Sequence, residues 1–365
     1  MKKRIILVVG TRPNFVKVTQ FKKIANKYPE LDLKIVHTGQ HYDEKMSNIF
    51  LKQFNIEVDY FLGISNASAN SLIGEIIIKL EKIVTDFKPH LLLCVGDVNS
   101  TLAAAICANK LNIKLGHIES GLRSLDRAMP EEINRILTDE LSDICFVTEK
   151  SGIQNLKNIG KTNSQIAFVG NTMIDTLVHF TKEIEASPIL EEIQQKKGTY
   201  ILVTMHRPRN VDSKEALLKI IDLFKNIAQK NIIVFSIHPR TKNSFIKFNL
   251  YSQLSKIKNL TIIAPQNYFS FQKLIKYAFC VITDSGGIQE ETTFQQIPCI
   301  TLRENTERPS TINEGTNQLM SFNTEKIESV IAEICEGKSK KGSIPELWDG
   351  NATERIIKKI IEFLS

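Results

Sequence analysis

The chain has 365 residues, of which 42% are hydrophobic and 24% charged, so it is long enough for two globular domains with full cores. Its net charge of +7 is spread along the chain, and no run of like charge is long enough for a nucleic-acid-binding tail. The apolar run after the basic N-terminus is too short for a signal peptide, and no stretch reaches the roughly 20 apolar residues of a membrane helix. We therefore expect a cytoplasmic protein without nucleic-acid or membrane partners.

Apolar runs of strand length alternate with amphipathic segments of helix length along the chain. The predicted strands of the first half are Arg4–Val9, Leu33–His37, His90–Val95, Leu115–Ile118, Ile144–Val147 and Ile166–Val169. Those of the second half are Tyr200–Thr204, Ile232–Ile237, Leu260–Ile263, Phe279–Thr283 and Cys299–Leu302. This alternation predicts an α/β fold of two doubly wound parallel sheets with helices on both faces. We place the first domain at residues 1–172, the second at 173–350 and a C-terminal helix, packed back on the first domain, at 351–365.

Polar residues follow several of these strands. The first strand leads into a glycine turn with Arg12 and Lys17, which could meet phosphate oxygens, and the third and fourth lead into Asp97 and Glu119. In the second half, His206 follows the first strand. Ligands of open parallel sheets bind beyond the carboxyl ends of the strands, so we predict one cleft between the two domains. Taken singly, Lys17 also fits a solvated helix face, and Asp97 also fits a turn.

The stretch Thr283-Asp-Ser-Gly-Gly-Ile-Gln-Glu-Glu291 follows an apolar strand and leads into a predicted helix. Ser285, Gly286 and Gly287 therefore form a strand-to-helix turn, whose backbone N–H groups and positive helix end suit a diphosphate. Glu291, one turn further along the helix, could reach the hydroxyl pair of a ribose. The same glycines also fit an ordinary turn that needs glycine for its backbone angles.

Common cofactor motifs are absent from the sequence. No Gly-x-Gly-x-x-Gly motif follows the first strand, and no Gly-x-x-x-x-Gly-Lys-Ser/Thr motif occurs, which disfavours a dinucleotide site and a Walker-type NTPase. The six cysteines include no Cys-x-x-Cys pair, and most lie inside apolar patterns. We therefore predict buried free thiols in a reducing compartment and no zinc.

Three carboxylates are the second indication of a functional site in the sequence. Asp97 and Glu119 follow neighbouring strands, and Glu131 comes after Pro130 at the start of a predicted helix. If they converge on one cleft, each raises the proton affinity of the others, which supplies an acid and a base near neutral pH. Glu131 and its neighbour Glu132 also fit a simpler role, since carboxylates stabilise the positive end of a helix.

Short polar motifs recur along nearly the whole chain in a characteristic order. They are Gly10–Pro13, His37–His41, Gly96-Asp97, His117–Arg123, Pro130–Arg135, Val169–Thr172, His206-Arg207, Thr283–Glu291 and Thr306–Pro309. This set resembles the non-hydrolysing UDP-N-acetylglucosamine 2-epimerases. The resemblance implies a GT-B-like fold, with two Rossmann-like domains facing a central cleft, and a homodimer. It also implies interconversion of UDP-N-acetylglucosamine and UDP-N-acetylmannosamine, without a metal or a nicotinamide cofactor, for surface polysaccharide precursors.

The resemblance also implies roles for individual residues. The implied catalytic residues are Asp97, Glu119, Glu131 and His206. The residues implied for the UDP-sugar are Arg12, Lys17, Phe271, Ser285, Gly286, Gly287, Glu291 and Arg308. Candidates for an allosteric site are Gln40, His41, Glu132 and Arg207. The segment Ser65–Ser71 stands where allosteric family members carry an Arg-Gln pair, which argues against full allosteric activation.

The implied reaction begins with loss of UDP, because the hydrogen on C2 of the sugar is not next to a carbonyl. Anti elimination gives a 2-acetamidoglucal, and re-addition of UDP with protonation of the opposite face inverts C2. The form of Leu122–Pro130 is shared with relatives that act on 2,3-diacetamido uronic acids or 6-deoxy sugars, so a modified UDP-sugar is an alternative substrate. A hydrolysing epimerase that releases UDP and N-acetylmannosamine, a GT-B glycosyltransferase and a non-catalytic UDP-sugar sensor are further alternatives.

Overall fold

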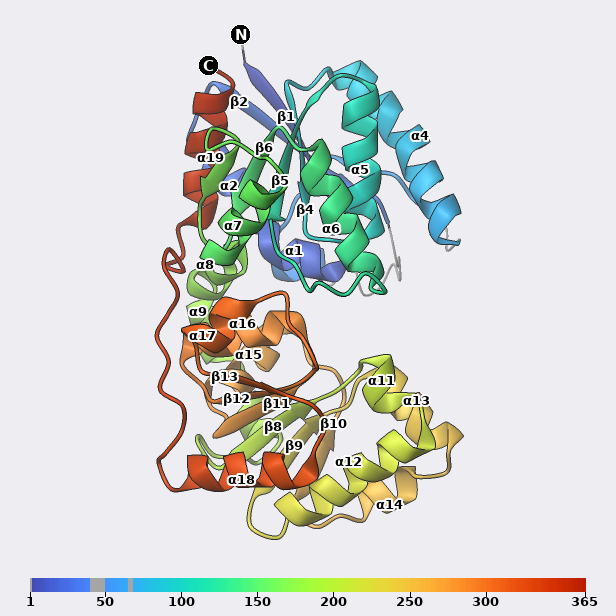
Figure 1. The fold of residues 1–365 in the computed structure, drawn as a ribbon, viewed down its shortest axis with the longest axis vertical. Coiled ribbons are helices and arrows are strands. Elements are labelled where there is room, and N and C mark those ends of the chain that lie inside the picture. Colours follow the sequence, from blue (N-terminus) through green and yellow to red (C-terminus); the bar gives the residue numbers. More distant parts are fainter. Residues whose placement is uncertain (1, 40–49, 65–67) are drawn as a thin grey trace. The chain divides into compact units, whose positions relative to one another are not determined.

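The computed structural model describes residues 2–39, 50–64 and 68–365. They form two compact α/β units, which Figure 1 colours along the chain. The first unit comprises Met1–His179 and Glu346–Ser365, and the second comprises Phe180–Pro345. The first unit extends past residue 172, because helix α8 (Thr172–His179) packs within it against α1 (Arg12–Val18).

The first unit is built on a seven-stranded sheet with the order β3-β2-β1-β4-β5-β6-β7. All neighbouring strands in it are parallel. The strands are β1 (Lys3–Val9), β2 (Leu31–His37), β3 (Tyr60–Phe61), β4 (Leu91–Val95), β5 (Lys114–Ser120), β6 (Ile144–Val147) and β7 (Ile166–Phe168). The strand order reverses between β1 and β4, and open parallel sheets form a crevice for ligands at such a reversal.

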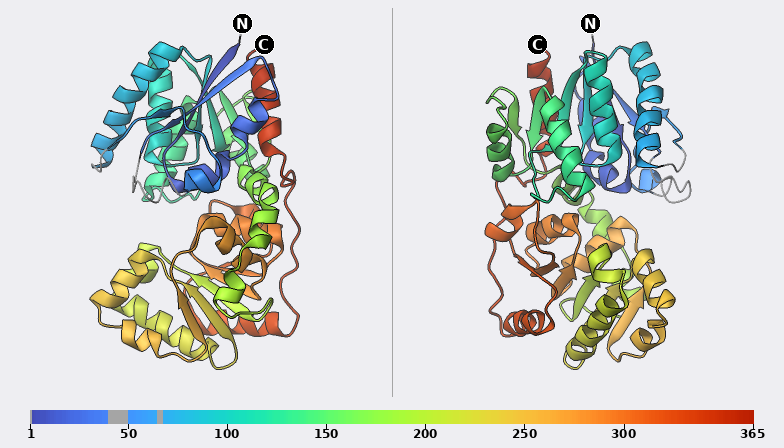
Figure 2. Two further views of the ribbon diagram at one scale, coloured as in Figure 1. Left: turned by 180° about the vertical axis from the view of Figure 1, so that it is seen from behind. Right: turned by 45° about the vertical axis from the view of Figure 1, so that its right-hand side comes forward.

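Helices cover both faces of this sheet. One face packs against α1, α2 (Phe21–Ala25) and α19 (Ala352–Phe363), and the other against α4 (Ala69–Phe87) and α5 (Asn99–Lys110). Figure 2 shows α19 and α4 on opposite sides of the sheet. The alternation of β1 explains this: Ile5 and Leu7 point to the first set of helices, and Ile6 and Val8 to the second. The remaining helices described here are α6 (Pro130–Leu141), α7 (Lys150–Asn158) and α8.

Asp175 on α8 anchors the C-terminal helix α19. Its carboxylate accepts hydrogen bonds from the backbone N–H groups of Ala352 (3.0 Å) and Thr353 (2.6 Å), which begin that helix. N–H groups of a first helical turn have no partner within the helix, so this carboxylate caps α19 from outside. Burial raises the pKa of Asp175, although the same hydrogen bonds act in the opposite direction. The last residues of the chain are therefore tied to the first unit.

The second unit repeats this topology with six parallel strands in the order β10-β9-β8-β11-β12-β13. The strands are β8 (Tyr200–Thr204), β9 (Ile232–Ser236), β10 (Leu260–Ile263), β11 (Cys280–Thr283), β12 (Cys299–Leu302) and β13 (Asn317–Met320). Here the order reverses between β8 and β11. In the second unit, the place expected for a ligand crevice is therefore at the carboxyl ends of these two strands.

Helices also cover both faces of the second sheet. Ile201 and Val203 of β8 pack toward α12 (Lys214–Ile227), α13 (Pro239–Lys247), α14 (Tyr251–Ser255) and α18 (Thr324–Cys335). Tyr200 and Leu202 pack toward α10 (Ile189–Glu192), α15 (Tyr268–Lys276) and α16 (Gly286–Gln295). The unit also contains α9 (Thr181–Ala186), α11 (Pro208–Val211) and α17 (Pro309–Asn313). No helix among the described residues of either unit is long and apolar enough to cross a membrane.

The structure confirms the predicted fold class of two parallel-sheet α/β domains. Each predicted strand overlaps an observed parallel strand. Two short strands, β3 and β13, were not predicted. Both lie at sheet edges and are largely half-buried or exposed. A strand at an edge is not covered on all sides, so it lacks the continuous apolar run that marks a central parallel strand.

Candidate active site

Three polar side chains of the first unit meet at Gly96, directly after β4. A Cβ atom added to Gly96 would lie 3.3 Å from Nδ2 of Asn14, 3.3 Å from Nζ of Lys17 and 3.8 Å from Oε2 of Glu119. Gly96 has a φ of +72°, which side chains rarely adopt. Lys17 and Glu119 are both buried and form an ion pair. The structure thus brings the predicted lysine and one predicted catalytic carboxylate together at the carboxyl edge of the sheet.

Glu119 has an unusual backbone conformation. Its φ is +70°, and the pairing of β5 with β6 shifts register between Ile118 and Ser120. This extra residue is a β-bulge, a feature that redirects a side chain and is frequent beside active sites. A non-glycine residue in such a conformation costs on the order of 1–3 kcal/mol, so the surrounding structure must hold it there. The strain at Glu119 therefore supports a functional role for its carboxylate.

A buried histidine and aspartate support the bulge and the turn after β4. Nδ1 of His117 lies 2.6 Å from Oδ1 of Asp139, and Nε2 of His117 lies 2.8 Å from the carbonyl oxygen of Gly96. The other oxygen of Asp139 accepts a hydrogen bond from the N–H group of Gly121 at 3.1 Å and pairs with Arg123 at 2.6 Å. Burial acts to raise the pKa of Asp139, but His117 and Arg123 outweigh it, and the pKa is lowered. An ionised Asp139 therefore ties the two segments together.

Asp97, the predicted catalytic residue next to Gly96, is paired with a cation. Its carboxylate forms an ion pair with the buried guanidinium of Arg135 on α6. Its carbonyl oxygen accepts a hydrogen bond from Nδ2 of Asn134, on the same helix, at 2.9 Å. Helix α6 therefore holds both the side chain and the backbone of Asp97.

The two carboxylates at the start of α6 have different surroundings. Glu132 is buried and accepts hydrogen bonds from the backbone N–H groups of Ser124 (2.8 Å) and Leu125 (3.2 Å), so it shapes the loop before the helix. Glu131 is half-buried at the second position of the helix. The convergence of Glu131 with Asp97 and Glu119 on one cleft stays a prediction.

In the second unit, Asp284 holds His206 at the reversal of strand order, between the ends of β8 and β11. The buried carboxylate accepts hydrogen bonds from the backbone N–H groups of His206 (3.0 Å) and Arg207 (2.8 Å) and from Nδ2 of Asn210 (3.0 Å). Its Oδ1 lies 3.0 Å from Nδ1 of His206. Burial acts to raise the pKa of Asp284, but His206 and the other donors outweigh it and lower the pKa. This contact orients the imidazole through Nδ1.

Helix α16 begins at Gly286, with Ser285 at its N-cap position. Among the described residues, no side chain caps this end, and no acidic residue lies in the first turn. The backbone N–H groups and positive end of the helix therefore suit an anion. A Cβ atom at Gly286 would lie 2.6 Å from Nη1 of Arg308 and 2.9 Å from Oε1 of Glu307. Glycine at this position lets the guanidinium of Arg308 lie against the helix end.

Glu291 lies one turn further along α16 and is buried. Burial raises its pKa to about 8; a hydrogen bond with Gln272 acts against this, and the charge of Glu290 adds to it. The carboxyl group is therefore largely protonated near neutral pH and can both donate and accept hydrogen bonds. Phe271 on α15 is half-buried and packs against the core of the second unit.

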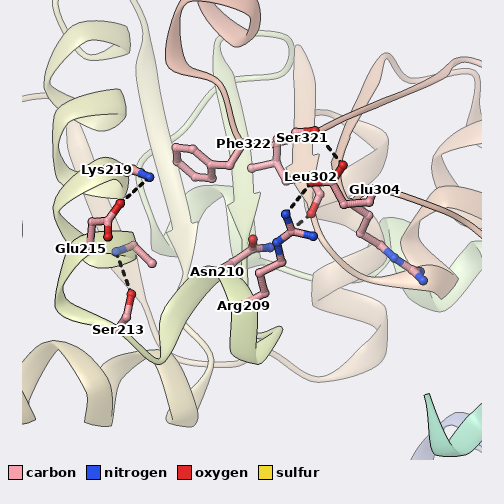
Figure 3. Close-up of a pocket in the computed structure, with 11 residues that line it drawn as sticks. Arg209, Asn210, Ser213, Glu215, Lys219, Leu302, Glu304, Ser321 and Phe322 are labelled. Carbon is pink, nitrogen blue, oxygen red and sulfur yellow. Dashed lines mark hydrogen bonds and ion pairs between the residues drawn. The ribbon is translucent and has the colours of Figure 1, made fainter. Parts of the chain in front are cut away.

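A cavity of about 300 Å³ in the second unit lies beside α12, between that helix and the ends of β12 and β13 (Figure 3). Two ion pairs occupy its walls, Arg209 with Glu304 at 2.7 Å and Lys219 with Glu215 at 2.8 Å. None of the predicted site residues is among those that line it. Arg303, which lines the cavity, pairs with Glu307, the neighbour of the predicted site residue Arg308.

Some predicted site residues lie outside the described part of the chain. Gln40 and His41 belong to residues 40–49, and the side chain of Arg12, whose backbone begins α1, is not described either. Sequence reasoning also missed supporting residues. Arg135, Asp284 and Glu307 each lie inside a motif recognised in the sequence, and Asp284 and Glu307 are directly next to Ser285 and Arg308, which were singled out there. Those positions were the available signal.

Comparison with known proteins agrees with these features. A family model described as UDP-N-acetylglucosamine 2-epimerase matches residues 23–361. A UDP-N-acetylglucosamine 2-epimerase homolog of Methanococcus maripaludis is 43% identical over 97% of this chain and 98% of its own length. A UDP-2,3-diacetamido-2,3-dideoxy-D-glucuronate 2-epimerase of Pseudomonas aeruginosa is 38% identical over 97% of this chain and 98% of its own length. The structure of Methanocaldococcus jannaschii UDP-GlcNAc 2-epimerase in complex with UDP-GlcNAc and UDP has a TM-score of 0.88 and 37% identity, covering 99% of each chain. The chain belongs to the UDP-N-acetylglucosamine 2-epimerase family.

Proposed function

We propose that this chain is a non-hydrolysing 2-epimerase that interconverts UDP-N-acetylglucosamine and UDP-N-acetylmannosamine. The observation that carries the proposal is Glu119, a buried carboxylate that is held at a β-bulge and paired with Lys17. A carboxylate fixed in this way can serve as a general acid or base in proton transfer at a sugar carbon. Membership of the family supports the proposal, and so does the M. jannaschii relative, whose structure contains UDP-GlcNAc and UDP.

The proposed reaction starts at the bond between C1 of the sugar and the diphosphate oxygen. This bond breaks with its electron pair leaving on UDP, and a carboxylate takes the proton from C2, which leaves a 2-acetamidoglucal with a C1=C2 double bond. UDP then adds back to C1, while a carboxyl group delivers a proton to the opposite face of C2. Asp97, Glu119 and Glu131 are the proposed acid and base groups. One proton is removed and one returned, and no water is consumed.

The proposed role of the second unit is to bind UDP as the leaving group. The helix end at Gly286 and the guanidinium of Arg308 offer N–H donors to the diphosphate, where negative charge grows as the C1–O bond breaks. His206, oriented by Asp284, would act at the same diphosphate. Glu291 is proposed for the ribose hydroxyls.

A modified UDP-sugar is the second candidate substrate. The P. aeruginosa relative that is named for a 2,3-diacetamido uronic acid is 38% identical over nearly the whole chain. Substituents on C3 and C6 do not change the chemistry at C1 and C2. The same acid and base groups would therefore serve either sugar, and only a substrate comparison separates the two.

We also propose that the enzyme works in the cytoplasm as a homodimer and supplies precursors of surface polysaccharides. Its six cysteines are free thiols, and five of them are buried. This supports a reducing compartment. The homodimer is proposed from the family resemblance, and sedimentation of the purified protein would test it.

Proton NMR in deuterated buffer tests the proposed function. The protein is incubated with UDP-N-acetylglucosamine, and the C2 proton and the anomeric phosphate linkage are followed. We expect UDP-N-acetylmannosamine with deuterium at C2 and an intact linkage to UDP. Free UDP together with free N-acetylmannosamine would identify a hydrolysing enzyme instead. If nothing changes, while UDP-2,3-diacetamido-2,3-dideoxy-glucuronate is epimerised in a parallel tube, the second candidate replaces the first.

Conservative variants in the same assay test the assigned carboxylates. Asp97→Asn and Glu131→Gln should slow turnover by roughly 10²–10⁴-fold, as expected for loss of a general acid or base, while UDP still binds. Glu140→Gln is a matched control, because Glu140 lies on α6 like Glu131 but is exposed. Wild-type turnover in both variants would refute the assignment.

A further inference from the structure

A buried network of arginines and glutamates surrounds Arg308 in the second unit. Arg308 forms an ion pair through Nε with Glu290 at 2.9 Å and a hydrogen bond through Nη1 with Oε1 of Glu307. The other oxygen of Glu307, Oε2, lies 2.9 Å from Nη2 of Arg303, the residue after β12. All four side chains are less than one tenth exposed. Glu307 therefore bridges two guanidinium groups, one with each oxygen.

Arg308 and the bridging Glu307 lie beside the end of α16. A side chain at Gly286 would collide with Arg308 and with Glu307, so the bridge itself lies against the first helical turn. The Arg303 side chain is 7% exposed, and among the described residues its Nη1 atom has no hydrogen-bond partner. Burial lowers the pKa of Arg303, and the positive charges of Arg207 and Arg308 lower it further, against the attraction of Glu307.

Positively charged groups gather in this region. The guanidinium groups of Arg207 and Arg308 both act to lower the pKa of Arg303, while Glu307 pairs with Arg303 and Glu290 pairs with Arg308. Buried charges are costly unless they are paired, and repulsion among guanidinium groups adds to the cost. An anion at the end of α16 would offset this repulsion. Arginine suits phosphate oxygens because its planar fork can donate two parallel hydrogen bonds.

We propose that Glu307 is a positioning residue that presents two guanidinium groups to the diphosphate of UDP, and that Arg303 is a further phosphate-binding residue beside Arg308. This inference rests on the proposed function, because it takes the anion to be the diphosphate. The alternative is that Glu307 affects UDP binding only through its negative charge. A bridge orients the two arginines, whereas a sum of charges treats Glu307 only as a negative charge that repels phosphate.

Replacing Glu307 with glutamine separates these two views. Glutamine keeps the shape of the side chain but has a single acceptor oxygen, and its amide nitrogen donates. One of the two arginines would then face a donor and lose its orientation, so UDP should bind more weakly. If only the charge mattered, removal of a negative group would strengthen UDP binding. The sign of the change is therefore the decisive result.

The test measures UDP by calorimetric titration and uridine, which lacks both phosphates, by NMR titration. For Glu307→Gln and Arg303→Met we expect the Kd of UDP to rise about tenfold, the effect of one lost charge-assisted contact. The Kd of uridine should stay unchanged, because uridine has no phosphate to contact. Glu304→Gln and Arg209→Met are matched controls with the same change of charge, and this exposed pair faces the cavity in Figure 3. Both controls should bind UDP like the wild type.

The titrations have outcomes that support the proposed role of Glu307 and outcomes that overturn it. UDP affinity that is unchanged or tighter in Glu307→Gln overturns the proposal, as does an equal loss of UDP and uridine affinity, which indicates general damage to the unit. If Glu307→Gln does not fold, Arg303→Lys replaces it, because lysine keeps the charge but lacks the fork, and a loss of UDP affinity alone supports the proposal. A wild-type protein that binds no UDP refutes the proposed function itself. Wild-type UDP binding with unchanged variants refutes only this inference.

Discussion

Replacing Glu291 with glutamine should stabilise the protein in the absence of nucleotide, and the gain should grow with pH. Glu291 is buried on α16, where burial, opposed by Gln272 and reinforced by Glu290, raises its pKa from 4.5 to about 8. Glutamine has the shape of the protonated carboxyl group but no proton to release. The variant therefore isolates the free energy that is linked to this one ionisation.

The sign follows from the two protonation states. The folded protein keeps on Glu291 a proton that the unfolded chain releases above pH 4.5. The free energy of unfolding of the wild type is therefore greatest below pH 4.5 and falls as the pH rises through the window up to about 8. The slope is about 1.4 kcal/mol per pH unit, so the loss at neutral pH is about 3 kcal/mol. The glutamine variant does not suffer this loss.

Calorimetric melting of the two proteins without nucleotide, from mildly acidic to mildly alkaline pH, measures the effect. At neutral pH the melting temperature of the second unit should be about 10 °C higher in the variant, since roughly 2–4 °C corresponds to 1 kcal/mol in a domain of this size. Near pH 5 the two proteins should melt almost together. Glu333→Gln is the matched control, because Glu333 is exposed on α18.

Two results would refute this reasoning. A difference in melting temperature that is the same at every pH would mean that Glu291 ionises alike in the folded and unfolded chain. A variant that is less stable than the wild type at mildly alkaline pH would mean that the folded protein favours the charged carboxylate. Either outcome would also remove the basis for treating Glu291 as a neutral hydrogen-bonding group at neutral pH.

Further outcomes are expected at Glu119, Lys17 and Gly286. Glu119→Gln should lower turnover by roughly 10²–10⁴-fold in the NMR assay with UDP affinity retained, and a loss below tenfold would argue against its role in proton transfer. Lys17→Met should cost about 3–5 kcal/mol in calorimetric unfolding because it removes the cation that pairs with the buried carboxylate of Glu119, and Lys17→Met combined with Glu119→Gln should cost less than the two changes added together. Gly286→Ala should raise the Kd of UDP about tenfold, since its Cβ atom would displace the guanidinium of Arg308, and unchanged affinity in titration calorimetry would disprove that contact.

The central strands were predictable because each is buried on both faces. The even and odd residues of β1 enter two different cores, so the whole run Ile5–Val9 must be apolar, and that pattern is visible without a structure. The edge strands β3 and β13 carry no such requirement and were missed. The strand-to-helix turn at Gly286 was also readable, because a glycine pair between a strand and a helix is a local feature.

The sequence by itself determined the two parallel sheets, the order of the motifs and the residue types at the strand ends, since all of these depend on local periodicity and local chemistry. Only the tertiary structure decided which side chains meet. The pairing of Lys17 with Glu119, the contact of His206 with Asp284 and the bridge through Glu307 join groups that are separated along the chain or oriented by the fold. These contacts follow from strand order and from the β-bulge in β5, which no local pattern encodes.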